Sequence, residues 1–359
     1  MRLTVVGRAT AGVLGLGLML GAVVTSPAAP WAEGSRGRPL DRALHAHAEA
    51  EAAGPAVIAD LDPVVPELAV EPSSTTTTTM PPSTTTTAPP PKFTLEPYRG
   101  LGAWMDVYDW SATFAKGGPA LEPDAVDVLA AQGVQTLFIQ ASKWDAPTDV
   151  LEPERLMAFV ERAHQHDIAV VGWYLPTLED PARDLQRMLA IAALPIEGIA
   201  VDIEARNVGD VAERNRRLID LSAQLRAALP GMTIGAIPLE PVLLEEINPA
   251  YWPGFPWREL GPHYDVWLPM SYWTNRRGGW RDAYIYSANN INRVRHNIGE
   301  PGAPVHVIGG IGDLTTVEDL VKFRQAAFER KVLGASIYDF RTTQGPHWAE
   351  LLPLRELGR

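Results

Sequence analysis

The sequence contains no cysteine. Without cysteine the chain cannot form a disulfide framework, a thiolate zinc site, an iron–sulfur cluster, a catalytic cysteine or a lipoprotein anchor on a modified cysteine. Basic residues are also in the minority, since 31 Lys and Arg stand against 43 Asp and Glu in 359 residues. The net charge of −12 and the lack of a local basic stripe argue against nucleic acid as a partner.

The apolar run near the N-terminus is short for a membrane span. Residues 11–24 are apolar or glycine throughout, two arginines precede them, and the small residues Ser26, Ala28 and Ala29 follow. This order is typical of a secretory signal peptide, and the run is shorter than the about 20 residues that cross a bilayer as a helix. We therefore predict a signal peptide over residues 1–30, with an uncleaved signal anchor as the alternative. We then expect the protein to be secreted or extracytoplasmic, or associated with the cell envelope.

A tract of threonine and proline follows this segment. Residues 73–91 read SSTTTTTMPPSTTTTAPPP. Such a tract buries too little apolar surface to offset the entropy lost on ordering. We predict that residues 31–94 form a disordered linker, whose Thr/Pro-rich stalk holds a domain away from a membrane or cell wall. Membrane contact is expected only through an uncleaved N-terminal segment.

Residues 95–359 alternate short strand-like segments with helical ones. Apolar residues three and four apart indicate helices over 153–166, 180–193, 211–229 and 316–329. Eight candidate strands are bounded by Gly, Pro or Asp, at 104–108, 136–141, 169–174, 198–204, 233–238, 265–272, 305–310 and 335–340. The alternation and the length, close to about 250 residues, predict the α/β fold class and a single (β/α)8 TIM barrel.

A doubly wound open sheet is the structural alternative. It should carry a glycine-rich nucleotide turn after its first strand. The chain instead reads DWSATFAKGG after residue 108. The sequence therefore favours the barrel.

In a TIM barrel, chemistry is carried by polar residues at the carboxyl ends of the strands. In the segment GIAVDIE, alternation of side chains predicts that Asp202 and Glu204 both face the barrel interior. Two carboxylates in a partly dry pocket cannot both ionise freely, so one is available as a general acid, as glycoside hydrolysis requires. The alternative is that both acids pair with Arg206 or other rim donors and only hold loops.

Tryptophans also fall at or just past the predicted strand ends, at Trp110, Trp144, Trp173 and Trp273. Their flat apolar faces are suited to stacking on sugar rings. A small phosphorylated metabolite would need basic groups instead. The main basic candidates, Arg276 and Arg277, are expected on a solvated loop.

Two groups of barrel hydrolases resemble the chain at these residues. MDVYDW places Asp106 and Trp110 as in the Asp-Val-Ser-x-Trp element of the family 25 lysozymes, with Tyr108 in place of the serine. AAQGVQTLFIQASKWD and VERAHQHDIAVVGWYLP are similar to the second and third strands of that family. The fourth strand of that family ends in Asp-x-Glu, which Asp202 and Glu204 match.

The family 18 chitinases carry DGxDxDxE on strand four and Met-x-Tyr on strand six. EGIAVDIE and MSYW keep the last acid pair together with Met270 and Tyr272. Glu197 and Ala200 replace the first two aspartates of the motif, and Trp273 replaces the acid that often follows the tyrosine. The tryptophan of strand eight is absent near Tyr338-Asp339-Phe340. The chain thus resembles a divergent member of this broad glycosidase group.

This resemblance implies a glycosidase that cleaves a β-linked polysaccharide of N-acetylated amino sugars, such as peptidoglycan or chitin. Glu204 would be the general acid, Asp202 would orient the attacking acetamido group of the substrate, and Asp106 would support the charge that develops on it. Tyr272 would hydrogen-bond the acetamide. The other expected substrate-binding residues are Trp110, Gln140, Trp173, Trp273 and Asp339. The chemistry needs neither a metal nor an organic cofactor, and a monomer is expected.

Two other functions remain open at this point. A non-catalytic carbohydrate-binding barrel would use the same groove and tryptophans, with the acid pair disabled by its departures from the family motifs. A phosphate-binding barrel would use Gly309, Gly310 and Gly312, which precede a helix. We interpret these glycines as turn and close-packing residues, because acidic groups nearby would repel phosphate.

Overall fold

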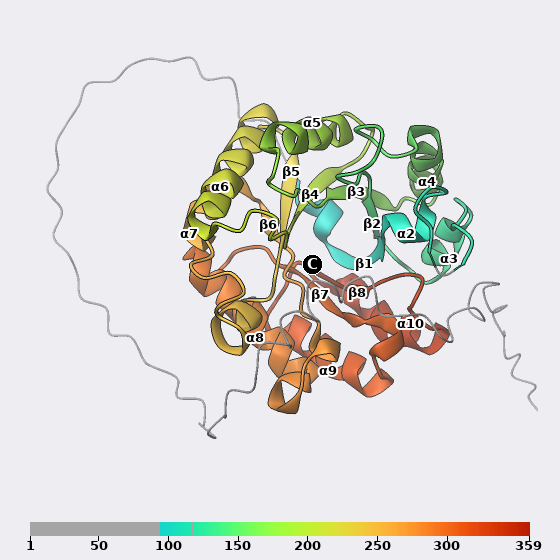
Figure 1. The fold of residues 1–359 in the computed structure, drawn as a ribbon. Coiled ribbons are helices and arrows are strands. Elements are labelled where there is room, and N and C mark those ends of the chain that lie inside the picture. The colour runs from blue at the N-terminus through green and yellow to red at the C-terminus, as the bar shows by residue number, and fades with distance from the viewer. Residues whose placement is uncertain (1–93, 117) are drawn as a thin grey trace, which may run out of the picture.

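A computed structural model describes residues 94–116 and 118–359 (Figure 1). The predicted signal peptide at residues 1–30, and all of the predicted linker except its last residue, lie outside this part of the chain. Within the described part, no helix has both the length and the apolar character to cross a membrane.

The described residues form one eight-stranded parallel sheet. Its strands are β1 Gly100–Met105, β2 Thr136–Gln140, β3 Ala169–Tyr174, β4 Gly198–Ile203, β5 Thr233–Pro238, β6 Val266–Trp267, β7 His306–Ile311 and β8 Gly334–Tyr338. The strand order is β6-β5-β4-β3-β2-β1-β8-β7. Parallel bridges from Trp267 to Val305 and from Met270 to Ile308 join β6 to the β7 side. The sheet thus closes into the predicted (β/α)8 barrel.

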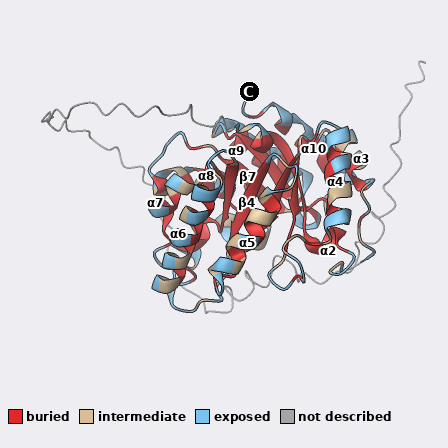
Figure 2. Ribbon diagram, turned by 90° about the horizontal axis from the view of Figure 1, so that it is seen from above, coloured by how far each residue is buried: buried red, intermediate tan, exposed pale blue. Residues whose placement is uncertain are grey.

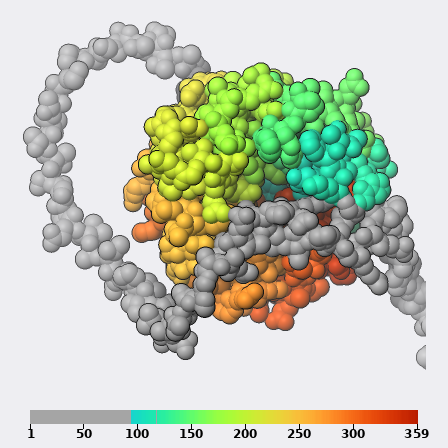
Figure 3. Space-filling model, in the orientation of Figure 1, coloured from blue at the N-terminus to red at the C-terminus, as the bar shows by residue number. Residues whose placement is uncertain are grey.

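A helix follows each strand and packs outside the sheet, so the helices ring the strands (Figures 1 and 2). The four helices predicted from periodicity match within one residue at each end. The outer helices are α3 Ala125–Ala131, α4 Pro153–Gln165, α5 Pro181–Ala192, α6 Val211–Ala228, α7 Trp257–Leu260, α8 Ala283–Ile298, α9 Val317–Glu329 and α10 Gly345–Leu351. In the space-filling view the segments follow one another around the rim in chain order (Figure 3).

Shorter helical turns lie in the connections. A π-helical turn, η3 Leu243–Ile247, precedes the four-residue helix α7. The 3-10 turns are η2 Glu96–Tyr98, η4 Gly261–His263, η5 Trp273–Asn275, η6 Gly278–Arg281, η7 Gly312–Leu314 and η8 Leu352–Glu356.

The first strand differs from its prediction. It ends at Met105 and does not extend to residue 108, because the next residues form the short helix α2 (Val107–Trp110). Asp106 caps this helix with its side chain, and Asp109 returns a bond to the backbone N–H of Asp106. This capping box turns the chain out of the sheet directly after the strand.

The sixth strand is also shorter than predicted, with two residues instead of the range 265–272. Pro269 has no N–H to donate to a neighbouring strand, so the regular ladder stops before it. The segment nevertheless keeps its place between its neighbours. The Met270 N–H donates to the Pro238 carbonyl at 3.2 Å, and the Ser271 N–H donates to Ile308.

Tyr98 fills the amino-terminal end of the barrel. Its hydroxyl donates to the Ile199 carbonyl at 2.5 Å. Gly198 and Gly235 make room for its ring, because a Cβ would lie 3.0 Å from the Tyr98 hydroxyl at the first position and 2.9 Å from the ring at the second. The carboxyl end of the barrel carries α2, at the opposite end from the C-terminus (Figure 2).

The glycines of the seventh strand serve close packing. A Cβ at Gly309 would lie 2.7 Å from the Trp273 ring, and one at Gly310 would lie 2.8 Å from Trp273 and Thr274. These contacts confirm the interpretation of both residues as close-packing glycines.

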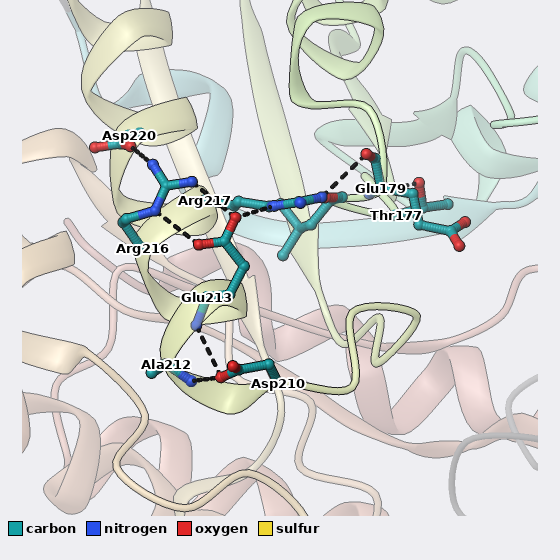
Figure 4. A network of polar contacts seen from close by, with 9 residues as sticks. Thr177, Glu179, Asp210, Ala212, Glu213, Arg216, Arg217 and Asp220 are labelled. Atoms are coloured by element: carbon teal, nitrogen blue, oxygen red, sulfur yellow. Dashed lines mark hydrogen bonds and ion pairs between the residues drawn. The ribbon is translucent and has the colours of Figure 1, made fainter.

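A polar network ties α6 to the loop that leaves β3 (Figure 4). Asp210 caps α6 by accepting hydrogen bonds from backbone N–H groups of its first turn, including that of Glu213 at 3.2 Å. The Glu213 carboxylate pairs with Arg217 at 2.7 Å. Arg217 in turn donates to the carbonyls of Leu178 at 2.8 Å and Glu179 at 3.1 Å. The network therefore holds the loop after β3, at the end of the barrel where β4 delivers its acids.

Candidate active site

A cavity of about 200 Å³ opens among residues at the carboxyl ends of the strands. Of the nine predicted site residues, six line it: Glu204, Asp202, Asp106, Gln140, Trp173 and Tyr272. The other three, Trp110, Trp273 and Asp339, do not belong to its lining.

The acid pair of β4 faces this cavity, as side-chain alternation predicted. Asp202 is 7% exposed, and its Oδ1 accepts no hydrogen bond within the described part of the chain. Burial, and then the charge of Glu204, raise the pKa of Asp202 well above its usual range. Glu204 is half-buried, and burial followed by the charge of Glu240 raises its pKa to about 7. The two carboxyl groups therefore hold a proton near neutral pH.

These acids are not neutralised by a neighbouring arginine. The guanidinium of Arg206, the partner that the alternative interpretation required, lies 4.0 Å above the ring of Tyr251. Among residues 94–116 and 118–359, no ion pair joins a lysine or arginine to Asp202 or Glu204. A carboxyl group without a salt bridge is able to give up and regain its proton.

Asp106 lies at the cavity, but its carboxylate already has protein partners. Oδ1 accepts from the backbone N–H groups of Tyr108 at 2.7 Å and Asp109 at 3.1 Å. Oδ2 accepts from the Tyr338 hydroxyl at 2.8 Å. Through these bonds Asp106 caps α2 and orients Tyr338, which itself lines the cavity.

Asp339 is held within its own turn and does not belong to the cavity lining. It is 3% exposed, and its Oδ1 accepts from the Thr342 N–H at 2.9 Å. Its carboxylate lies with those of Asp106 and Asp109 in one buried cluster, where Asp109 pairs with Arg341 at 3.1 Å. Asp339 therefore lies outside the cavity lining, and its role in substrate binding stays a prediction.

The expectation for Trp110 and Trp273 is corrected, because both side chains are fully buried. The capping box turns Trp110 outward, where its ring meets Phe159 of α4 and its N–H donates to the Gln140 carbonyl at 3.1 Å. Trp273 packs on Phe323 of α9 with 5.1 Å between ring centroids. Neither ring offers a face to a sugar.

Other aromatic rings form the cavity wall. Trp104 donates its N–H to the Ser336 hydroxyl at 2.7 Å and meets Trp173 edge to face at 6.0 Å. The Trp173 N–H is buried without an acceptor among the described residues. The ring centroids of Tyr272 and Tyr338 lie 6.0 Å apart. Trp104 and Tyr338 are not among the residues predicted from the sequence, although Trp104 shares a strand face with Asp106 by simple alternation.

Trp144 stands at the edge of the cavity and is 57% exposed. Its loop is held by Arg187 of α5, which is buried and donates to the Ser142 hydroxyl at 3.0 Å. The same guanidinium donates to the carbonyls of Trp144 at 3.2 Å, Ala146 at 2.8 Å and Thr148 at 2.6 Å. One side chain thus fixes four points of the loop that presents Trp144.

The sequence predicts both Arg276 and Arg277 on a solvated loop, but only Arg277 is exposed. The prediction is wrong for Arg276. Arg276 is 6% exposed and donates to Glu240 Oε1 at 2.9 Å. Its Nε donates to the Tyr286 hydroxyl at 2.7 Å. An arginine that follows Trp-Thr-Asn and precedes Arg-Gly-Gly carries no local sign of burial, so only the tertiary fold reveals this pair.

Comparison with known proteins gives a likeness of fold. No protein-family model matches the chain, and no curated protein matches it. Ostrinia furnacalis Group IV chitinase has a TM-score of 0.51 and 10% identity, covering 71% of this chain and 98% of its own. The spore cortex-lytic enzyme SleL of Bacillus megaterium has a TM-score of 0.52 and 8% identity, with coverage of 72% and 74%. The chitinase-like agglutinin of Robinia pseudoacacia has a TM-score of 0.52 and 10% identity, with coverage of 71% and 99%. At such identities these likenesses show the shared barrel fold.

Proposed function

We propose that this barrel is a glycoside hydrolase that cleaves a β-linked polysaccharide containing N-acetylated amino sugars. The observation that carries the proposal is Glu204, which faces an aromatic-walled cavity with its pKa raised to about 7. A carboxyl group in this state can protonate a leaving glycosidic oxygen near neutral pH.

The roles of the neighbouring groups follow from their chemistry. As the glycosidic bond breaks, Glu204 gives its proton to the leaving oxygen. The acetamido oxygen of the substrate attacks the anomeric carbon, and water later opens the resulting ring while Glu204 regains a proton. Asp202 has a buried oxygen without a hydrogen bond from the described protein, which makes it the candidate partner for the acetamido N–H. Tyr272, at the same cavity, is the candidate donor to the acetamide.

The substrate class rests on the cavity wall and on the proteins that share the fold. Trp104, Trp173 and Tyr272 line the cavity beside the acids, and Trp144 exposes its ring at the rim. The barrels of similar fold include a chitinase and a spore cortex-lytic enzyme. The signal-like N-terminal segment supports action outside the cytoplasm, and the Thr/Pro tract supports a site near the cell envelope. We further propose that the protein acts as a monomer without a metal or organic cofactor.

A non-catalytic carbohydrate-binding barrel is the second candidate. It is favoured by the similar fold of an agglutinin and by the engagement of Asp106 in bonds to its own protein. It does not account for a half-buried Glu204 that carries a raised pKa and lacks a salt bridge within the described residues.

Hydrolysis assays distinguish the two candidates. The full-length protein and Glu204→Gln are incubated in parallel with purified peptidoglycan and with chitin oligomers, and new reducing ends are followed by mass spectrometry. Products from the wild type alone support the glycosidase. Retention of the polymer by both proteins, without products from either, supports the binding module. Equal turnover by both proteins refutes Glu204 as the acid.

A further inference from the structure

Behind the cavity wall lies an ion pair that the mechanism above does not use. Glu240, which follows β5, has no exposed surface, and its Oε1 accepts from Arg276 Nη2 at 2.9 Å. Arg276 also donates through Nε to the hydroxyl of Tyr286, on α8, at 2.7 Å. Neither Glu240 nor Arg276 belongs to the cavity lining, so neither is placed to touch a substrate in the cavity.

The strand register brings Glu240 close to the acid pair. β4 and β5 are adjacent and parallel, with Ile203 opposite Pro238. Glu204 follows Ile203 directly, and Glu240 lies two residues beyond Pro238. The two carboxylates therefore leave neighbouring strands at nearly the same level, at the same end of the barrel.

The pair is only partly satisfied. Glu240 Oε2 is buried and accepts no hydrogen bond from any described residue. A buried ion pair contributes little to stability by itself, because removing two charges from water offsets much of their attraction. A half-bonded carboxylate at this position thus calls for a reason other than stability.

The ionisable groups on the elements around Glu204 suggest an electrostatic reason. Asp202 comes from the same strand, Glu240 from the end of β5 and Tyr272 from the segment after β6. Burial and the charge of Glu240 raise the pKa of Glu204, and the pKa of Tyr272 is raised by burial and by the charges of the same acids. On the far side of Glu240, Arg276 and Tyr286 are its partners.

We propose that Glu240 and Arg276 are a positioning pair for Glu204, in which Arg276 holds the Glu240 carboxylate in place at the end of the strand next to that of Glu204. The role in catalysis rests on the proposed glycosidase function. The electrostatic coupling of Glu240 to Glu204 does not, because it is a property of the protein without substrate.

The test uses two variants of the full-length protein. Glu240→Gln removes the negative charge and leaves the buried Arg276 guanidinium without the carboxylate with which it pairs. The double variant Glu240→Gln with Arg276→Met removes both charges and leaves no buried ion unpaired. Glu245→Gln is the matched control, because Glu245 lies on the same β5–α7 connection, is exposed and pairs with Arg293.

Carbon-13 NMR of labelled glutamate carboxyls measures the titration of Glu204, whose signal is assigned by its loss in Glu204→Gln. We expect Glu204 to titrate about one pH unit lower in Glu240→Gln, because a neighbouring like charge has gone while burial persists, and to titrate lower by a smaller amount in the double variant, which also loses the positive charge of Arg276. In the Glu245→Gln control, Glu204 should titrate as it does in the wild type. If hydrolysis is found, the alkaline limb of the pH profile of kcat/KM should move to lower pH by the same amount as the titration midpoint of Glu204.

An unchanged midpoint in folded variants overturns the proposal, and so does the failure of both variants to fold, which would make the pair purely structural. A shifted NMR midpoint in a protein that hydrolyses nothing supports the coupling and refutes only the glycosidase. The two failures are therefore distinguishable.

Discussion

The Tyr338 hydroxyl donates to Asp106 Oδ2 at 2.8 Å and so joins the carboxyl end of β8 to that of β1. Both side chains line the cavity, and Asp106 also accepts two backbone N–H groups of α2. The aspartate that we expect to take part in the chemistry is thus also an anchor for a cavity-lining tyrosine.

Replacing this aspartate should separate anchoring from chemistry. We expect Asp106→Ala to lower the free energy of unfolding by about 1–3 kcal/mol, because a helix cap and a buried bond to Tyr338 are both lost. Asp106→Asn should cost less, since asparagine is also a good N-cap. Urea unfolding measures both. A variant with unchanged stability but no substrate binding would contradict this and return Asp106 to direct contact with substrate.

The raised pKa of Glu204 should appear in the pH dependence of stability. Folding favours its protonated form, so its contribution is full below pH 4.5, falls as pH rises through about 7, and is lost above that. Glu204→Gln stays neutral, so its stability relative to the wild type should increase by up to about 3 kcal/mol between pH 4 and pH 8. Unfolding curves across this range measure the difference.

Glu213 provides a control of opposite sign. Its bonds from Arg216 and Arg217 lower its pKa to about 2, so its contribution is present above its usual range and is lost as pH falls. Glu213→Gln should therefore be less stable than the wild type near neutral pH and match it in acid. A parallel pH trend for both variants would contradict the assignment to Glu204.

Much of the fold and half of the site follow from local patterns. Two-residue alternation is enough to place Asp202 and Glu204 on one face of β4, because a strand at the centre of a parallel sheet leaves its side chains no other choice. The same reasoning, carried back from Asp106, would have found Trp104.

What the sequence does not reveal depends on contacts across the barrel. Trp110 follows Asp106 at a spacing that resembles a lysozyme element, yet the capping box at Asp106 turns its ring into the helix layer. The sequence around Arg276 is typical of a loop, but the residue is buried by contacts with Glu240 and Tyr286, which are remote in sequence. Such partners are set by the tertiary fold, and no local period encodes them.

The close packing at β7 gives a stability prediction. Gly309→Ala should lower the free energy of unfolding by about 1–3 kcal/mol, because its Cβ would lie 2.7 Å from the Trp273 ring. Gly279→Ala is the matched control, since no atom of residues 94–116 or 118–359 lies within 4 Å of a Cβ there. Thermal unfolding measures the stability of both variants. Equal effects at the two positions would show that the Trp273 ring moves away from the new Cβ without loss of stability.

Trp144 and its clamp should govern the binding of long substrates. An exposed ring at the cavity edge can stack on a sugar distant from the acids, so Trp144→Ala should weaken the binding of long oligomers about tenfold and leave short ones unaffected. Trp144→Phe should retain much of the affinity, because it keeps an aromatic face. Titration calorimetry with oligomers of increasing length measures these effects. Each Trp144 variant also carries Glu204→Gln, so that the oligomers are bound but not cleaved.

Arg187→Lys tests whether the position of Trp144 matters as well as its presence. A single ammonium cannot reproduce the four bonds that the guanidinium makes to this loop, so exchange of the amide hydrogens of residues 142–148 should become faster. Affinity for long oligomers should fall along with this loss of order, although Trp144 itself is intact. Faster exchange with full affinity would show that Trp144 binds sugar without being held in advance.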